Sequence, residues 1–269
     1  KVIGFDINKS IVDTLNQGIS HIHHIDSKLI KEACDSNHFT ASCNFLKIKE
    51  VDAIIICVPT PLGEKQSPDI SHILETLKNI KNYLKKGHLI SLESTTYPGT
   101  TQEVLNPFIE NMNFKIGNNF FLIYSPERED PGNKKYKTNQ IPKLIGGDTI
   151  ACKELGSKLY ELINPNVITM SSTKTAETTK LLENVYRAVN IGLINELKEF
   201  TQEINVDIYE IINAAATKPF GYMPFYPGPG VGGHCIPIDP YYLLWKAKEK
   251  GMTIKLIELA GEINASIPI

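Results

Sequence analysis

The sequence predicts an α/β protein, with a Rossmann-like, doubly wound and mostly parallel sheet over residues 1–172 and an all-helical dimerisation region over residues 173–269. Two observations lead to this fold class. In the first part, short apolar runs without polar alternation are separated by single amphipathic helices, which is typical of parallel strands covered on both faces and joined by right-handed crossovers. In the second part, apolar residues repeat only at helical spacing.

The expected elements follow from these patterns in chain order. The first part is predicted to contain strand 2–7, helix 8–16, strand 52–59, helix 70–85, strand 89–92, helix 101–110, strand 120–124 and strand 166–170. The second part is predicted to contain helices 174–204, 208–216, 241–250 and 255–266. The helix over 174–204 has apolar residues on more than one face, so we expect it to form the centre of a two-fold homodimer.

Composition excludes several classes of protein. The 28 Lys and Arg residues nearly balance the 30 Asp and Glu residues, so the net charge of -2 predicts neither nucleic acid nor membrane surface as a partner. The longest uncharged apolar run, Ala53 to Val58, is far shorter than the ~20 residues of a membrane-spanning helix. Lys1 begins a strand pattern without a signal peptide, and the five cysteines are scattered, so we expect a cytoplasmic protein with reduced thiols.

Asp6 stands at the carboxyl end of the first expected strand. It has two interpretations, an acidic helix N-cap or the carboxylate that binds the adenosine ribose of NAD in a doubly wound domain. The glycine loop G-x-G-x-x-G that accompanies such an acid does not occur ahead of it in the chain. We therefore expect a further strand and a phosphate-binding loop before Lys1, with that strand at the centre of the sheet.

Two other strands end in segments that carry hydroxyl groups, Val58-Pro59-Thr60-Pro61 and Glu93-Ser94-Thr95. Ligands of open α/β sheets bind at the carboxyl ends of the strands. The alternative is a pair of ordinary strand-ending turns. Because both segments have the same character, we favour a ligand-binding cleft there.

Residues 225–240 contain eight Gly or Pro residues, around Cys235 and its neighbour His234. Most buried cysteines are inert small hydrophobes. A rigid setting of this kind instead predicts a nucleophilic thiol, and a helix beginning at Ile236 would lower the pKa of that thiol. Lys180 and Asn184 lie one helical turn apart, as two donors to an oxyanion or as solvated surface residues.

Six motifs occur in the chain in this order: the Asp6 strand, Val58-Pro59-Thr60-Pro61, Glu93-Ser94-Thr95, Ser125-Pro126-Glu127-Arg128, Lys180-Leu181-x-x-Asn184 and Gly232-Gly233-x-Cys235-x-Pro237-x-Asp239. Together they resemble the nucleotide-sugar 6-dehydrogenase family, the UDP-glucose and GDP-mannose dehydrogenases. The resemblance implies oxidation of a sugar 6-hydroxyl to a carboxylate with two NAD+. It also implies a C-terminal nucleotide-binding domain that would follow Ile269.

The resemblance implies a role for each matching residue. Cys235 would capture the aldehyde as a thiohemiacetal, which the second oxidation converts to a thioester for hydrolysis. Lys180 and Asn184 would stabilise the oxyanion, while Asp239, Thr95 and Glu127 would position water and move protons. The residues implied to bind NAD are Asp6, Val58, Pro59, Thr60 and Thr95. The residues implied to bind the substrate are Glu127, Arg128, Lys180, Asn184, Tyr226, Gly232 and His234.

Within the family, His234, Arg128 and the run 218–224 resemble the branch that acts on UDP-N-acetylhexosamines, particularly UDP-N-acetylglucosamine. UDP-glucose and UDP-N-acetylmannosamine are the alternative substrates. UDP-glucose enzymes usually carry Lys where Ile238 stands, which disfavours the first alternative.

Three other interpretations come from different classes of protein. Cys235 with His234 could serve a cysteine hydrolase, although adjacent side chains rarely point at each other. A metal site would need the scattered residues His21, His23, His24, Cys34, His38 and Cys43, which lack paired spacing. The third is a catalytically incomplete binding or assembly fragment.

Overall fold

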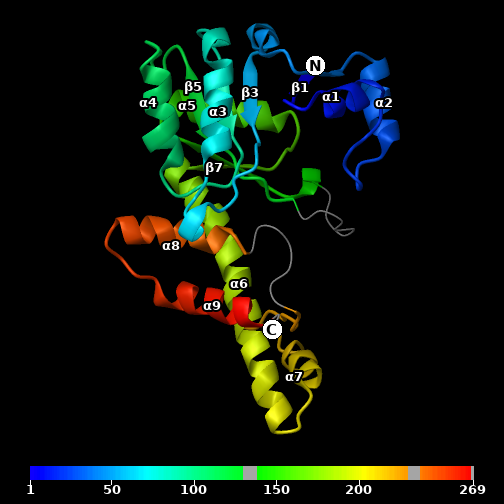
Figure 1. Ribbon diagram of the computed structural model, residues 1–269, viewed down its shortest axis with the longest axis vertical. Coiled ribbons are helices and arrows are strands. Elements are labelled where there is room, and N and C mark those ends of the chain that lie inside the picture. The colour runs from blue at the N-terminus through cyan, green and yellow to red at the C-terminus, as the bar shows by residue number, and fades with distance from the viewer. Residues whose placement is uncertain (130–137, 230–236, 268–269) are drawn as a thin grey trace.

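The computed structural model describes residues 1–129, 138–229 and 237–267. Its main sheet has the strand order β3-β4-β5-β6-β7 (Figure 1). The strands are β3 (Ala53–Ile56), β4 (Leu89–Leu92), β5 (Phe121–Tyr124), β6 (Lys143–Gly147) and β7 (Val167–Met170). β3, β4 and β5 are parallel, β6 is antiparallel to β5, and β7 is parallel to β6. The predicted mostly parallel sheet is confirmed.

A second sheet pairs β1 (Val2–Phe5) with β2 (Phe39–Ser42) in parallel, and it is separate from the main sheet. In the described part of the chain, β1 pairs only with β2 and β3 only with β4. One edge of β1 and one edge of β3 therefore lack a neighbouring strand there.

The helices of the first part bury the sheet because each has an apolar face. They are α1 (Lys9–Asn16), α2 (Ser27–Asp35), α3 (Ser71–Ile80), α4 (Asn106–Glu110) and α5 (Ile150–Glu161). Short helical turns span Phe45–Glu50, Glu64–Gln66, Lys81–Tyr83, Thr101–Leu105 and Thr138–Gln140. Ile73 and Leu77 of α3 are fully buried in the same core as Ile90 and Leu92 of β4. This core also contains residues of β3 and β5, so it holds the carboxyl ends of β3, β4 and β5 in place.

The second part is helical in its described residues, as predicted. It contains α6 (Thr173–Glu203), α7 (Ile208–Ala215), α8 (Asp239–Glu249) and α9 (Lys255–Ser266). α6 starts against β6 and runs away from the sheet, α8 and α9 pack across it, and α7 lies at its far end (Figure 1). No helix among the described residues has both the length and the apolar character that crossing a membrane requires.

The structure corrects the expected elements in three places. The predicted helix over 101–110 begins with a π-helical turn over Thr101–Leu105 and is α-helical only over Asn106–Glu110. α8 begins at Asp239, two residues before the expected start at Tyr241, and the condition of a helix from Ile236 is not met. The patterns also missed α2, β2, β6 and α5, whose apolar runs are short or interrupted.

Candidate active site

The carboxyl ends of β3, β4 and β5 lie side by side because these strands are parallel neighbours. They carry Val58, Pro59 and Thr60 after β3, Thr95 after β4 and Glu127 after β5. The Ser94 hydroxyl donates a hydrogen bond of 2.7 Å to the carbonyl oxygen of Val58, which joins two of these ends. The structure thus brings the expected strand-end residues to one edge.

The beginning of α6 brings two more predicted residues toward this edge. The Lys180 ammonium donates a hydrogen bond of 2.6 Å to the carbonyl oxygen of Glu127. One turn later, the buried Asn184 donates through Nδ2 to the carboxylate of Asp239, at the start of α8. Four of the predicted catalytic residues therefore form two contacts that α6 connects.

Arg187 was not predicted, yet it donates to Oδ1 of Asn184 from three residues further along α6. A guanidinium group can only donate hydrogen bonds. It therefore fixes the amide of Asn184 with Oδ1 toward Arg187 and Nδ2 toward Asp239. The i,i+3 spacing of Asn184 and Arg187 on a predicted helix was the signal that could have identified this contact.

The two carboxyl groups of the cluster differ in protonation behaviour. Burial raises the pKa of Asp239, although the Asn184 hydrogen bond and the charges of Lys180 and Arg187 act in the opposite direction. Burial also acts to raise the pKa of Glu127, but the charge and hydrogen bond of Lys143 and two backbone N–H groups outweigh it and lower that pKa. Such a pair of carboxyl groups suits one proton donor and one proton acceptor.

Lys143, Glu93 and Tyr160 form a network beside Glu127 that the sequence analysis did not assign to the site. The Lys143 ammonium lies 3.0 Å from Oε2 of Glu127 and 3.3 Å from Oε1 of Glu93. The Tyr160 hydroxyl donates to that same oxygen of Glu93. No sequence pattern pointed to Lys143, because β6 was not predicted.

A hydrogen bond also ties α8 to the strand ends. The hydroxyl of Tyr242 donates to the carbonyl oxygens of Thr60, at 2.9 Å, and Pro61, at 3.1 Å. Asp239 lies at the start of the same helix and is 2 % exposed. The segment expected to bind NAD and the helix that carries Asp239 are therefore directly joined.

Other predicted residues lie elsewhere. Tyr226 donates a hydrogen bond of 3.0 Å to Asn213 of α7, at the far end of α6. The guanidinium of Arg128 is held by Glu183, at 2.7 Å, and by the carbonyl oxygen of Pro142. Gly232, His234 and Cys235 are outside the described residues. Since α8 begins at Asp239, its N-terminus gives no support for a lowered pKa of the Cys235 thiol.

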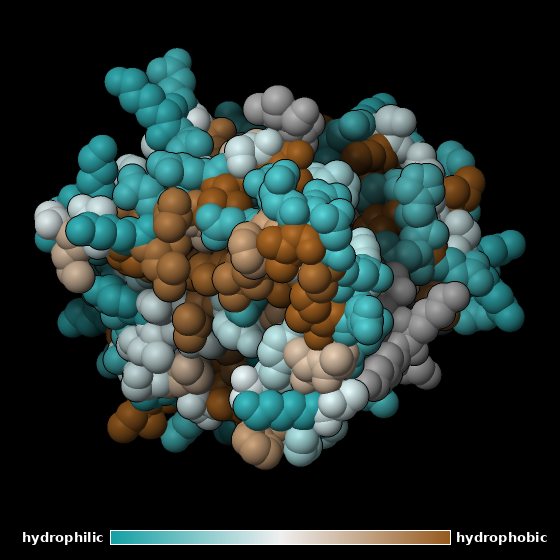
Figure 2. All heavy atoms as spheres, turned by 90° about the horizontal axis from the view of Figure 1, so that it is seen from below, coloured by the Kyte–Doolittle hydropathy of each residue, from teal (hydrophilic) through white to brown (hydrophobic). Residues whose placement is uncertain are grey.

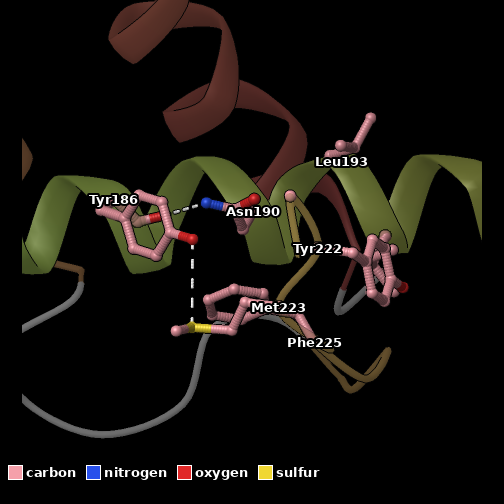
Figure 3. Close-up of a pocket in the computed structure, with 8 residues that line it drawn as sticks. Tyr186, Asn190, Leu193, Tyr222, Met223 and Phe225 are labelled. Atoms are coloured by element: carbon pink, nitrogen blue, oxygen red, sulfur yellow. Dashed lines mark hydrogen bonds between the residues drawn. The ribbon is translucent and has the colours of Figure 1, made fainter. Parts of the chain in front are cut away.

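A pocket of about 490 Å³ lies along α6 beyond Asn184 (Figure 3). Its lining residues are Tyr186, Asn190, Leu193, Ile194, Gly221, Tyr222, Met223 and Phe225. Figure 3 shows the Tyr186 hydroxyl directed at the sulfur of Met223, 3.9 Å away. The lining contains no charged residue, so this pocket differs in character from the Lys180–Asp239 cluster.

The hydrogen bonds of Asp6 show whether its carboxylate is available to bind NAD. Its Oδ1 accepts one hydrogen bond, of 2.7 Å, from the backbone N–H of Asn8. Asn8, and not Asp6, caps α1, which corrects the N-cap interpretation. A carboxylate has acceptor capacity beyond one hydrogen bond. Asp6 at the end of a parallel strand therefore fits the ribose of a dinucleotide.

Comparison with known proteins identifies two matching family regions. Residues 1–164 match the NAD binding domain of the UDP-glucose/GDP-mannose dehydrogenase family, and residues 174–266 match the central domain of the same family. The two regions cover most of the chain. They agree with the order of the sheet and helical parts in the structure.

Individual relatives give more detail. The chain is 39% identical over 265 residues to UDP-N-acetyl-D-glucosamine 6-dehydrogenase of Pseudomonas aeruginosa, covering 98% of the chain and 62% of that protein. It is 36% identical over 273 residues to UDP-N-acetyl-D-mannosamine dehydrogenase of Methanocaldococcus jannaschii, covering 100% and 60%. A solved structure of the UDP-D-ManNAc dehydrogenase from Pyrococcus horikoshii superimposes with a TM-score of 0.92 at 33% identity, covering 99% and 63%. The chain thus spans about three fifths of the length of these relatives.

Proposed function

The chain belongs to the UDP-glucose/GDP-mannose dehydrogenase family, and from this premise we propose that the full-length protein oxidises the C6 hydroxyl of a UDP-N-acetylhexosamine to a carboxylate with two NAD+. The observation that carries the proposal is the pair of contacts made by α6, Lys180 with Glu127 and Asn184 with Asp239. These contacts support the proposal because two side-chain donors and two carboxyl groups lie together beside the strand ends, where ligands of open α/β sheets bind.

In the proposed reaction, NAD+ held at the strand ends by Asp6, Val58, Pro59, Thr60 and Thr95 would supply the hydride acceptor for C6 in each of the two oxidations. The first oxidation gives an aldehyde, and addition of the Cys235 sulfur to its carbonyl carbon gives a thiohemiacetal. The second oxidation gives a thioester, and attack of water on it releases the carboxylate and the free thiol. Covalent capture keeps the aldehyde in the site between the two oxidations.

The other residues act on charge and protons. Lys180 and the Nδ2 group of Asn184 donate to the oxygen of C6 when it carries negative charge in the tetrahedral states. The lowered pKa of Glu127, which Lys143 and two backbone N–H groups maintain against burial, keeps its carboxylate ionised and able to accept a proton from the attacking water. Asp239, whose pKa is raised by burial, exchanges a proton with the oxygen that Asn184 and Lys180 hold. Thr95 helps to position the water.

We propose UDP-N-acetylglucosamine as the preferred substrate. Relatives of similar identity act on either the gluco or the manno epimer, so the acetamido group is the feature that their substrates share. A site that hydrogen-bonds this group leaves buried partners unpaired when the group is missing, at about 1 to 3 kcal/mol each. Discrimination against UDP-glucose and GDP-mannose is therefore expected to be about ten-fold or more in kcat/KM.

Initial rates of NADH formation by the full-length protein test both parts of the proposal. UDP-N-acetylglucosamine, UDP-N-acetylmannosamine, UDP-glucose and GDP-mannose are compared side by side. Two NADH per sugar are expected, since one NADH would mean that oxidation stops at the aldehyde. Equal or faster turnover of UDP-glucose would refute the substrate assignment. If none of the four sugars led to NADH formation, the proposed dehydrogenase activity would be refuted.

We also propose that the protein is a homodimer formed through α6. The helix exposes the large apolar side chains of Leu182, Leu193, Leu197 and Phe200, and the exposed Ile204 directly follows its last residue. Seen from below, the end of the molecule that carries the last turns of α6 shows apolar side chains gathered into a continuous area (Figure 2). Exposed apolar areas of this kind are typical of protein interfaces.

The division at residues 172 and 173 stays part of the proposal. We propose residues 1–172 as the NAD-binding region and residues 173–269 as the helical dimerisation and catalytic region. The unpaired edges of β1 and β3 are where the strand that leads to the glycine loop would complete the sheet. A UDP-binding domain would complete the substrate site.

A further inference from the structure

The direction of β6 brings a lysine to the edge where the candidate active site lies. β6 is antiparallel to β5, with Tyr124 opposite Gly146. Glu127 follows Tyr124 by three residues, and Lys143, the first residue of β6, precedes Gly146 by three residues. Because the strands run in opposite directions, both residues lie at the same edge of the sheet. In a fully parallel sheet, the first residue of β6 would have been at the opposite edge.

Lys143 is enclosed by acidic partners. Its ammonium lies 3.0 Å from Oε2 of Glu127 and 3.3 Å from Oε1 of Glu93, and its side chain is 13% exposed. The Glu93 side chain is 12% exposed, whereas that of Glu127 is 48% exposed. The lysine therefore joins a carboxylate inside the protein to one that solvent and ligands can reach.

The inner part of the network holds Lys143 in place. The Tyr160 hydroxyl donates to Glu93 and lies 2.8 Å from the hydroxyl of Ser91 in β4. The Lys143 ammonium also lies over the Tyr160 ring, 5.2 Å from its centre. Contacts from β4 and α5 thus limit the movement of the ammonium, which is what a group that orients another residue requires.

We propose that Lys143 is the positioning residue for the Glu127 carboxylate, which it holds ionised and in one orientation at the strand ends. The proposal rests on the proposed function, because it gives Glu127 a proton-accepting role. Oε1 of Glu127 is already occupied by the backbone N–H groups of Arg128, at 2.7 Å, and Glu129, at 2.8 Å. Lys143 supplies the side-chain cation at the other oxygen, Oε2.

The described charged and titratable groups around Glu127 come from several elements. Lys143 of β6 contacts its carboxylate, while Lys180 of α6 contacts only its carbonyl oxygen. Glu93, directly after β4, lies on the far side of Lys143, and the thiol of Cys57, after β3, interacts with both carboxylates. Without Lys143, Glu93 and Glu127 would face each other as like charges, which raises the pKa of Glu127.

The test uses Lys143→Met in the full-length protein, since methionine keeps much of the side-chain volume without the charge. Lys143→Arg is the conservative variant. Lys85→Met is the matched control, because Lys85 is an exposed lysine of the same sheet region that precedes β4 at the opposite edge. Each protein is labelled with ¹³C at the glutamate carboxyl carbon, and Glu127→Gln identifies the Glu127 signal.

We expect Lys143→Met to move the titration of Glu127 to higher pH, and Lys143→Arg and Lys85→Met to leave it close to that of the unaltered protein. In NADH formation, the acidic limb of the kcat profile should move in the same direction. At that limb kcat should fall about ten-fold or more, with KM for the UDP-sugar changed far less. A role confined to stability would lower the melting temperature without moving the pH profile.

An unchanged Glu127 titration in Lys143→Met would overturn the proposal. If the unaltered protein forms no NADH with any of the sugars, the proposed function fails, and the carboxyl titration still decides whether Lys143 controls Glu127. If Lys143→Met does not fold, the double variant Glu93→Gln/Lys143→Met removes both inner charges, and Gln still accepts from Tyr160. In this double variant Glu127 should also titrate at higher pH than in the unaltered protein, because the Lys143 cation is missing.

Discussion

The contact between Asn184 and Asp239 allows a sharp prediction, because the polarity of each partner is fixed. The two residues are 1 % and 2 % exposed, so water cannot replace a lost partner. Arg187 requires the Asn184 oxygen on its side, which leaves the Nδ2 group for the Asp239 carboxylate. Exchanging the two side chains would put a carboxylate beside Arg187 and an amide at position 239, and would restore an amide–carboxylate hydrogen bond with its direction reversed, from position 239 to position 184.

The two single substitutions perturb this arrangement differently. Asp239→Asn removes the charge but keeps a carbonyl oxygen that can accept from Nδ2 of Asn184, whereas Asn184→Asp removes the Nδ2 donor and places two carboxylates together. A hydrogen bond to a charged group contributes about 1.5 to 3 kcal/mol to stability; Asn184→Asp loses one, whereas Asp239→Asn loses only the charge of its acceptor. The double variant Asn184→Asp/Asp239→Asn recovers the hydrogen bond, so we expect the two changes to be coupled by about 2 to 3 kcal/mol.

Urea unfolding of the four proteins measures the coupling. The free energy of unfolding of the double variant should exceed the value expected from adding the two single effects by about 2 to 3 kcal/mol. Effects that add within about 0.5 kcal/mol would show that Arg187 does not fix the amide, and would refute the reasoning. Turnover should separate from stability. The double variant should unfold almost normally yet form NADH slowly, because the donor and the carboxylate have exchanged places relative to the sugar.

Mass spectrometry of full-length Asp239→Asn with substrate and NAD should detect a sugar adduct on Cys235, and normal turnover by Cys235→Ala would disprove the covalent mechanism. Light scattering should give a dimer at micromolar concentration, and Phe200→Asp, which charges an exposed residue of α6, should give monomers. Glu177→Ala should lower the urea midpoint, because buried Glu177 accepts from Gly99 and Thr101 and each unsatisfied donor costs about 1 to 3 kcal/mol. Glu154→Ala, at an exposed position, is its control.

The parts of the fold that could be predicted are those with a strong local pattern. The apolar runs that became β3, β4 and β5 are continuous because parallel strands are buried on both faces. α6 was recognised because its apolar residues repeat without a breaker over 31 residues. β2 and β6 were missed because Phe39–Ser42 and Lys143–Gly147 contain too few large apolar residues for such a pattern.

The candidate site divides along a similar line. Residues within recognisable motifs, such as Lys180, Asn184 and Asp239, were predicted as candidates. Lys143 could not be predicted, because its role depends on the direction of β6, and strand direction is decided by tertiary pairing. A helix start at Ile236, on which a lowered pKa of the Cys235 thiol depended, is not met because α8 begins at Asp239.

The close packing of α6 on the sheet explains why both parts of the chain are needed for the site. A Cβ atom at Gly146 of β6 would lie 2.6 Å from the Ser172 carbonyl oxygen and 2.8 Å from Cβ of Ala176. The Ser172 oxygen belongs to the backbone and cannot rotate aside as a flexible side chain could. A side chain at position 146 would therefore push the first turns of α6 away from the sheet. Lys180 reaches the carbonyl of Glu127 from these turns, whereas Lys143 reaches its carboxylate from β6 itself. Any shift of α6 would therefore separate Lys180 and Asn184, the proposed oxyanion donors, from the Glu127 carboxylate that the sheet keeps in place.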